Sequence, residues 1–213
     1  GSSLGEATGQ GAPALLKLGT ATNVFNTDTF NIGTGARDGG NVVFQSTTGS
    51  ITIAPRTTAT VAFNMGTGTA TTGYTDHNTF DVTGHQANLN LGVVTIGTQG
   101  ARTGQMDNIF SFDTGTLSMT SLVMSTKTAA AVTNSTLNIG GGTATIGSGT
   151  GTAVSLSSAT AGTANSFINL TGGTTTIKGN VVRAGGAGTT AATLKISGGS
   201  LNIGAGATVV GET

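Results

Sequence analysis

Apolar residues recur at every second position in short segments along most of the chain. A period of two places alternate side chains on the same face of a β-strand. Thr, which is common between the apolar positions, is β-branched and favours the same conformation. The pattern therefore predicts a folded, nearly all-β chain, with strands that include residues 30–32, 51–53, 63–65, 80–82, 110–112, 137–139, 168–170, 194–196 and 201–203.

The predicted strands belong to a repeated unit. Each copy is a short strand, a turn that contains Gly in most copies, and a second strand. Phe80 and Phe110, which hold equivalent positions, are 30 residues apart, and Phe110 and Leu137 are 27 apart, so the unit varies in length. The copies are residues 79–89 (with His85 at the turn), 108–119 (with Gly115 at the turn), 135–146, 166–177 and 192–203.

A unit of this size cannot bury its own apolar face, so successive units must stack. Stacked parallel coils pair each strand with its equivalent in the next coil, about 4.8 Å away. The main alternative is a β-propeller, but its blades are longer, roughly 40–50 residues. We therefore predict a parallel β-helix (β-solenoid) of about seven irregular coils over residues 21–213, with residues 1–20 as a lead-in or cap segment.

Two glycine-rich runs suggest a family. Residues 170–177 and 196–206 resemble the strand repeats of autotransporter-type passenger domains, found in bacterial surface proteins with autotransporter-associated β-strand repeats. The resemblance extends over most of residues 28–210. It implies a right-handed parallel β-helix, an extracellular or cell-surface location in a bacterium, and a structural or adhesive role.

Composition and charge exclude several other classes. The chain has 37 Gly and 44 Thr but only 8 basic and 8 acidic residues, which leaves too few helix formers for a helical protein. A net charge of zero without clustered Lys or Arg argues against nucleic-acid binding. The absence of Cys excludes disulfides and thiolate metal sites. No apolar run approaches the roughly 20 residues of a membrane-spanning helix, so we expect no transmembrane segment.

Residue types that serve in catalysis gather in two neighbouring units. A polysaccharide-cleaving enzyme would need paired carboxylates or a base converging on one face. Asp also commonly stabilises turns, and no basic residues surround the group. We therefore expect no enzyme, no cofactor, and no catalytic, cofactor-binding or metal-binding residue, with a weak divalent cation site as a lesser alternative. The residues concerned are Asp76, His77, Asp81, His85, Asp107 and Asp113.

Polar residues between the apolar ones are expected to face outward. Thr174, Thr175 and Thr176 would form flat hydroxyl arrays suited to ordered water, carbohydrate or another flat surface, although β-propensity alone also explains them. Six Asn residues that lie between apolar neighbours are predicted to occupy one position of the repeat. They either stack as amide ladders or simply face solvent. These are Asn31, Asn64, Asn90, Asn138, Asn169 and Asn202.

The function expected from this architecture is physical. The sequence starts without Met and ends within the repeat pattern, so we expect continuation in a larger chain or end-to-end self-association, which can generate filaments. The prediction is an extracellular structural or adhesive β-solenoid of a bacterial surface protein or appendage. The alternative is a polysaccharide-degrading enzyme or a glycan-binding module on the same scaffold, making contact with a glycan or a surface.

Overall fold

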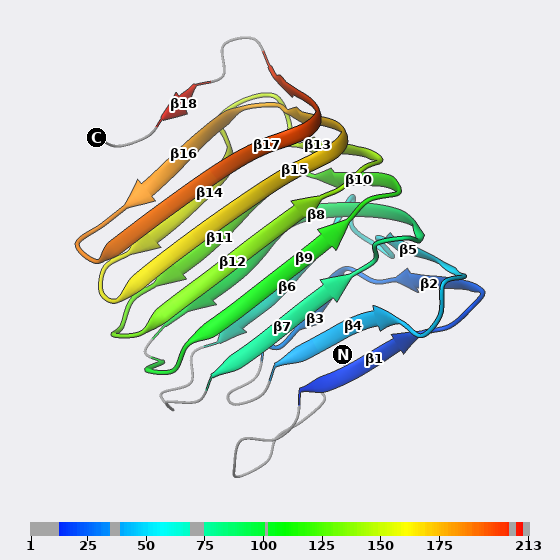
Figure 1. Ribbon diagram of the computed structural model, residues 1–213, viewed down its shortest axis with the longest axis horizontal. Helices are drawn as coiled ribbons and strands as arrows, with labels where there is room; N and C mark the ends of the chain where they lie inside the picture. Colours follow the sequence, from blue (N-terminus) through cyan, green and yellow to red (C-terminus); the bar gives the residue numbers. More distant parts are fainter. Residues whose placement is uncertain (1–12, 35–38, 69–74, 101, 205–207, 211–213) are drawn as a thin grey trace.

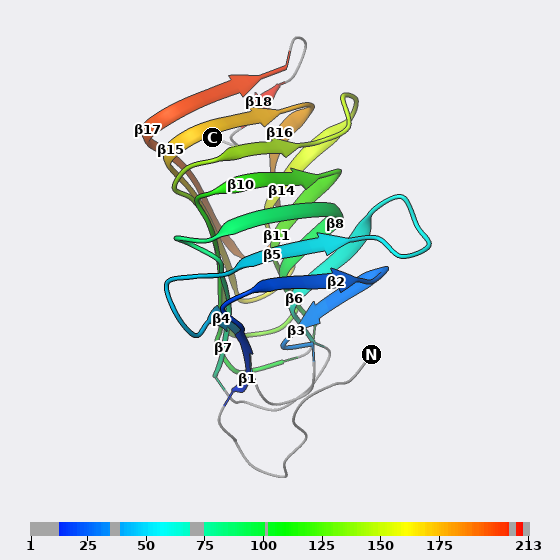
Figure 2. The same cartoon turned by 90° about the vertical axis from the view of Figure 1, so that its right-hand side faces the viewer.

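The computed structural model describes residues 13–34, 39–68, 75–100, 102–204 and 208–210. Within these residues the regular structure is entirely β, in 18 strands, and every strand pairing is parallel (Figure 1). The strands wind into a solenoid with three faces, here called the first, second and third face (Figures 1 and 2). The prediction of a parallel β-solenoid is confirmed, and the propeller alternative is wrong.

Each face is a stack of seven parallel strands or half-strands. The first face contains β1 (Ala14–Leu18), β4 (Gly40–Phe44), β7 (Asp76–Asp81), β9 (Met106–Phe112), β12 (Val132–Ile139) and the first parts of β15 (Thr163–Ile177) and β17 (Thr189–Ile203). The second face contains β2 (Thr22–Asn26), β5 (Ser50–Ala54), the first part of β8 (Gln86–Gln99), β10 (Gly115–Met119), β13 (Thr143–Ile146) and the second parts of β15 and β17. The third face contains β3 (Thr29–Ile32), β6 (Val61–Gly68), the second part of β8, β11 (Ser121–Lys127), β14 (Thr152–Ala159), β16 (Asn180–Gly185) and β18 (Val209–Val210).

The register follows the sequence repeat. On the first face, Phe80 pairs with Phe110, and Phe110 pairs with Leu137, as the sequence spacing predicts. Seven strands separated by six steps make about six turns. The steps differ in length, because Ala14 pairs with Gly40, 26 residues on, whereas Asn41 pairs with Thr79, 38 residues on. The extra residues lie mainly in the corners, so strand pairing continues from coil to coil, with local register shifts in the pairs β6–β8, β14–β16 and β15–β17.

The core follows from the alternation of side chains along each strand. Upstream it is aromatic: Phe63, Phe80 and Phe110 are fully buried, with ring centroids 5.3 Å apart for Phe63–Phe80 and 4.9 Å apart for Phe80–Phe110. Downstream the same first-face column holds the buried Leu137 and Ile168. Burial of these columns is the main stabilising contribution, at about 25 cal/mol per Å² of apolar surface.

A left-handed residue interrupts the third-face strands at the same place in five successive coils. A residue with positive φ shifts the alternation of inward and outward side chains by one residue. Beyond it, the side chains that point inward are the ones that a strict period of two would place outside. In β11, for example, Met124 and Lys127 are both buried although they are three residues apart. The left-handed residues are Gly33, Gly66, Gly97, Ser125 and Ser157, with φ of 57°, 61°, 74°, 52° and 50°.

Candidate functional site

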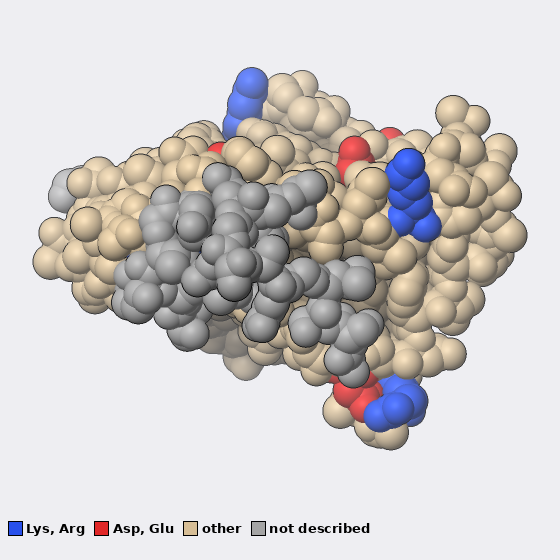
Figure 3. Space-filling view, turned by 90° about the horizontal axis from the view of Figure 1, so that it is seen from below, with Lys and Arg blue, Asp and Glu red and all other residues tan. Residues whose placement is uncertain are grey.

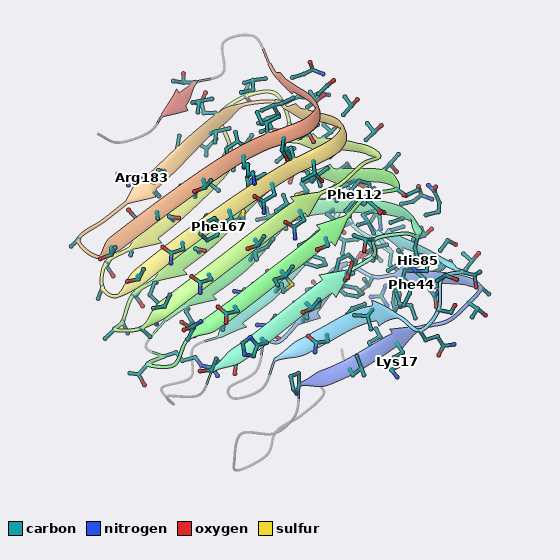
Figure 4. All side chains as sticks on the ribbon, in the orientation of Figure 1. Lys17, Phe44, His85, Phe112, Phe167 and Arg183 are labelled. Atoms are coloured by element: carbon teal, nitrogen blue, oxygen red, sulfur yellow. The ribbon has the colours of Figure 1, made fainter. Side chains whose placement is uncertain are left out.

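The Asp and His residues near residue 80 do not converge. Asp76 points inward and is buried, whereas its neighbour His77 points outward, with Nδ1 3.3 Å from Asp107 Oδ2. His85 is buried at the corner between the first and second faces and stacks on Phe44, with centroids 3.6 Å apart (Figure 4). These side chains therefore lie in three different environments.

The two remaining carboxylates hold turns. Asp81 accepts hydrogen bonds from the backbone N–H of Thr83 at 3.1 Å and from its hydroxyl at 2.8 Å. Asp113, in the next coil, accepts a bond from the N–H of Gly84 at 2.8 Å. Both are the turn roles that Asp commonly serves. His85 lies in this turn, but Ala87 rather than His85 pairs with Gly115, because the turn is longer here than in the later coils.

Buried charged groups lie at the corner between the third and first faces. Asp76 forms an ion pair with Arg102, and both side chains are almost fully buried. The ammonium group of Lys127 donates to the carbonyl oxygens of Gly100 at 3.3 Å and of Arg102. Burial, and next the charge of Arg102, lower the pKa of Lys127. This cluster fixes the connection from the third coil to the fourth.

The alternation of apolar and polar residues does not predict the buried positions of Arg102 and Lys127. Polar residues in a strand are expected outward, but Lys127 follows the left-handed Ser125, which reverses the alternation. One signal was present: Lys127 aligns with Gln99 and Gly68 in the preceding coils, and these follow Gly97 and Gly66 in a matching pattern. A Gly that recurs two residues before this position in the preceding coils indicates that the alternation of side chains is reversed there.

Around this corner, two interior columns face each other, and we call them the inner polar seam. On the first face the column contains Asn78, Asn108, Ser135 and Ser166, and on the third face it contains Gly66, Gly97, Ser125 and Ser157. The side chain of Asn78 donates to Asn108 Oδ1 at 2.9 Å, and Asn108 donates to the carbonyl oxygen of Asn134 at 3.0 Å. The seam therefore supplies hydrogen-bond partners to polar side chains that are buried inside the solenoid.

A ladder of side chains runs along the outside of the first face. His77, Asp107, Asn134 and Asn165 occupy one column in four successive coils. Asn134 Nδ2 donates to Asp107 Oδ1 at 2.7 Å, and Asn165 Nδ2 donates to Asn134 Oδ1 at 2.9 Å. Each of these hydrogen bonds joins neighbouring coils, so the column stabilises the stacking of the coils.

The six Asn residues predicted at one repeat position in fact lie on three faces. Asn64 donates to Asn31 on the third face, and Asn169 donates to Asn138 on the first, each at 2.9 Å. Amide ladders are therefore confirmed for these two pairs. The single-position prediction is wrong, because the same local pattern occurs on every face. Asn90 and Asn202 lie on the second face.

The second face presents two outward columns of small polar residues. Thr174 pairs with Thr143, and Thr176 pairs with Thr145, and all four point outward. Thr175 was predicted to face outward with its neighbours, but it is 1% exposed, because it occupies the interior column of Leu117 and Ala144. The hydroxyl surface is therefore narrower than predicted.

A partly buried carboxylate organises a loop between the second and third faces. Asp28 accepts hydrogen bonds from the backbone N–H groups of Arg56 at 3.0 Å and Thr57 at 2.7 Å, and also from the N–H of Thr58. The hydroxyl and backbone of Thr57 hold the pKa of Asp28 well below its usual range. This carboxylate joins the first coil to the second, because it accepts hydrogen bonds from residues of the next coil.

The C-terminal end of the solenoid exposes apolar side chains. Ile196 is 52% exposed and Ile203 is 38% exposed, although both occupy interior columns of the coil. One coil earlier, the equivalent residues Leu170 and Ile177 are buried. Among the described residues, the last coil therefore covers its interior apolar side chains less than the coil before it does.

The described ranges contain no group of three or more His, Cys, Asp or Glu able to hold a metal ion. No helix within them is long and apolar enough to cross a membrane. Comparison with protein-family models, with curated proteins and with solved structures found no match to this chain.

Proposed function

We propose that this chain is a structural or adhesive rod of a bacterial surface protein or appendage, located outside the cell. The observation that carries the proposal is the parallel strand pairing that joins each coil to the next, reinforced by side-chain bonds between coils such as Asn165–Asn134 and Asn64–Asn31. Such a stack is stiff along its axis, because each coil is bonded to its neighbours along all three faces.

The surface chemistry supports the same role. The outward strand positions are mainly Thr, Ser and Asn, and Figure 3, seen from below Figure 1, shows few basic and acidic side chains among the uncharged ones. The prominent carboxylates, among them Asp28, Asp81 and Asp113, are engaged by the backbone of neighbouring turns. The glycine-rich runs that resemble autotransporter-associated repeats agree with a bacterial surface location.

Antibodies against the purified chain would test the location and the role together. On intact cells of the source bacterium, we expect surface labelling and, by electron microscopy, labelled rods or fibres. Labelling that requires cell lysis would contradict the proposal. A second readout is adhesion: beads coated with the chain should attach to surfaces or cells better than beads coated with the same chain unfolded in urea.

A glycan-binding module is a second candidate, supported by the two outward columns of the second face. Thr143, Thr145, Thr174 and Thr176 present hydroxyl groups on a regular sheet. Binding of a polysaccharide that is lost in Thr174→Val and Thr176→Val, but kept in Thr193→Val on the first face, would favour this candidate. A glycan array without any binding would remove it.

A further inference from the structure

The first face carries exposed apolar side chains in the middle of a polar surface. Ile109 of β9 is 42% exposed and Phe167 of β15 is 36% exposed. Both lie in one outward column, with Thr136 of β12 between them (Figure 4). On this face, strand pairing runs from β7 to the first part of β17 without a register shift, so the outward side chains form straight columns. A regular sheet surface of this kind can pack face to face against another sheet.

Two opposite charges lie beside this column, at different heights along the solenoid. The neighbouring outward column begins with Asp81 on β7, continues through Ser111, Asn138 and Asn169, and reaches Lys195 on β17. The carboxylate therefore lies two strands before β12 and the ammonium group two strands after it. At about 4.8 Å per strand the two charges are roughly 19 Å apart, so they do not pair within one chain.

A two-fold axis along β12 brings these groups together between two copies. The axis reverses the second copy along the solenoid, so each strand faces the strand that lies equally far on the other side of β12. Lys195 then faces Asp81 of the second copy, and Ile109 faces Phe167 of the second copy. Each contact occurs twice, because a two-fold interface uses the same patch on both copies.

Other positions of the axis do not pair the charges. An axis along β9 would place Lys195 over Lys17, which lies at the start of the same column. Like charges brought together in an interface disfavour the arrangement. An axis along β15 would place Lys195 over Asn138 and leave Asp81 without a cation. The charge pattern therefore selects β12 as the centre.

The outward column on the other side of Ile109 is compatible with the same arrangement. Asp107 would face Asn165 of the second copy. The carboxylate of Asp107 already accepts hydrogen bonds from the side chains of Gln105 at 3.0 Å and Asn134 at 2.7 Å. Covering it therefore does not leave an unsatisfied charge in the interface.

We propose that the first face of the solenoid is a docking surface for a second copy of this chain, which packs face to face about a two-fold axis along β12. Five strands, each about seven residues long, cover roughly 24 Å by 23 Å, so the two copies together bury about 1,100 Å². This area is near the lower limit for a specific interface, so the pair forms reversibly. The pairing uses the flat side of the rod and depends neither on the function proposed above nor on the ends of the solenoid.

Charge reversal tests the pairing of Lys195 with Asp81. Lys195→Asp alone brings carboxylates together at both contacts, and Asp81→Lys alone brings ammonium groups together. Each variant should dimerise roughly ten-fold more weakly than the unmodified chain at low salt. An equimolar mixture of the two should recover the dimer, because both contacts of a mixed pair again join opposite charges. Sedimentation velocity between about 1 μM and 1 mM measures these cases, and the differences should vanish at about 1 M salt.

Apolar variants locate the surface. Phe167→Asn should weaken dimerisation at least roughly ten-fold, because an aromatic side chain is lost from both halves of the interface. Val24→Asn, at an exposed apolar position of β2 on the second face, is the matched control and should leave dimerisation unchanged. Far-UV circular dichroism verifies that each variant is folded.

Three results would overturn the proposal. The first is an unmodified chain that stays monomeric at every concentration. The second is a dimer that Lys195→Asp leaves intact or that Phe167→Asn and Val24→Asn weaken equally. The third is a mixture of the two folded charge variants that stays monomeric.

Discussion

The upstream and downstream coils fill the space of the inner polar seam with different pairs of residues. In the upstream coils the first-face column carries Asn78 and Asn108, and the left-handed position facing it is Gly. A Cβ at Gly66 would overlap the amide of Asn108. In the downstream coils the first-face column shrinks to Ser166, and the left-handed position grows to Ser157.

The difference shows what selects Gly in this fold. Positive φ alone does not require it, because Ser125 and Ser157 adopt the same conformation at φ of 52° and 50°. Gly is required where a large amide on the opposite face occupies the space of its Cβ. The serines offset their backbone strain with hydrogen bonds, since Ser157 Oγ lies 2.8 Å from Ser166 Oγ and Ser125 Oγ lies 2.5 Å from the carbonyl oxygen of Asn165.

Removing the buried carboxylate of Asp76, two residues before Asn78 in β7, should have the largest effect. Asp76→Ala leaves the buried Arg102 without its carboxylate, and we expect the free energy of unfolding to fall by about 3–5 kcal/mol. Urea unfolding followed by far-UV circular dichroism measures the loss. Asp81→Ala, which removes only hydrogen bonds in a turn, should cost about 1 kcal/mol. Equal losses in the two variants would contradict a structural role for the buried pair.

Filling the upstream Gly position should come next. Gly66→Ala introduces a side chain at positive φ and against Asn108, so we expect a loss of about 2–4 kcal/mol. Gly84→Ala is the matched control, because Gly84 has φ of 76° but no atom within 4 Å of a new Cβ. It should show the backbone strain alone, about 1–2 kcal/mol. Adding Asn108→Ser to Gly66→Ala should recover part of the difference, and strict additivity in this cycle would refute the size compensation.

Ser157, the left-handed residue of the downstream coils, allows the opposite test, in which a side chain is removed instead of added. Ser157→Ala keeps the strained φ but loses the contacts of the hydroxyl with Ser166 and the carbonyl oxygen of Ala191, a cost of about 1 kcal/mol. Ser157→Gly loses the same contacts but relieves the strain. We therefore expect Ser157→Gly to melt at a higher temperature than Ser157→Ala. The opposite order would mean that the backbone at Ser157 is not strained.

The smallest expected effect is a pH dependence from Lys127. Its pKa is lower in the folded state than the ordinary value of 10.5, so the folded chain releases this proton at a lower pH than the unfolded chain does. The cost of the buried charge is fully present below the lowered pKa, and stability rises as the pH increases from there towards 10.5. Urea midpoints across this window should increase, and Lys127→Met should remove the increase. Lys17→Met, at an exposed position, should leave it unchanged.

The sequence was sufficient for the strand columns but not for the interior chemistry. Period-two alternation and recurrent Gly corners identified the stacking of Phe80, Phe110 and Leu137, because apolar burial dominates register. The inward position of Lys127 was missed, since a left-handed Ser has no local signature and the reversal it causes depends on the opposite face. Asp76 follows the period of two with Asn78 and Phe80, and its inward position was missed because its carboxylate was assigned to a turn. The faces of Asn90 and Asn138 were missed for a different reason: an Asn between apolar neighbours looks the same on any face.

Unequal coils have a consequence for how such a chain is assembled. Contacts between coils join residues 26 to 38 positions apart, as in the pairs Ala14–Gly40 and Asn41–Thr79. The entropy of closing a loop depends only on the logarithm of its length, so the longest coil costs about 0.3 kcal/mol more to close than the shortest. Every coil thus faces nearly the same entropic barrier, however many coils precede it. Elongation of the chain by further coils would not slow the addition of the next one.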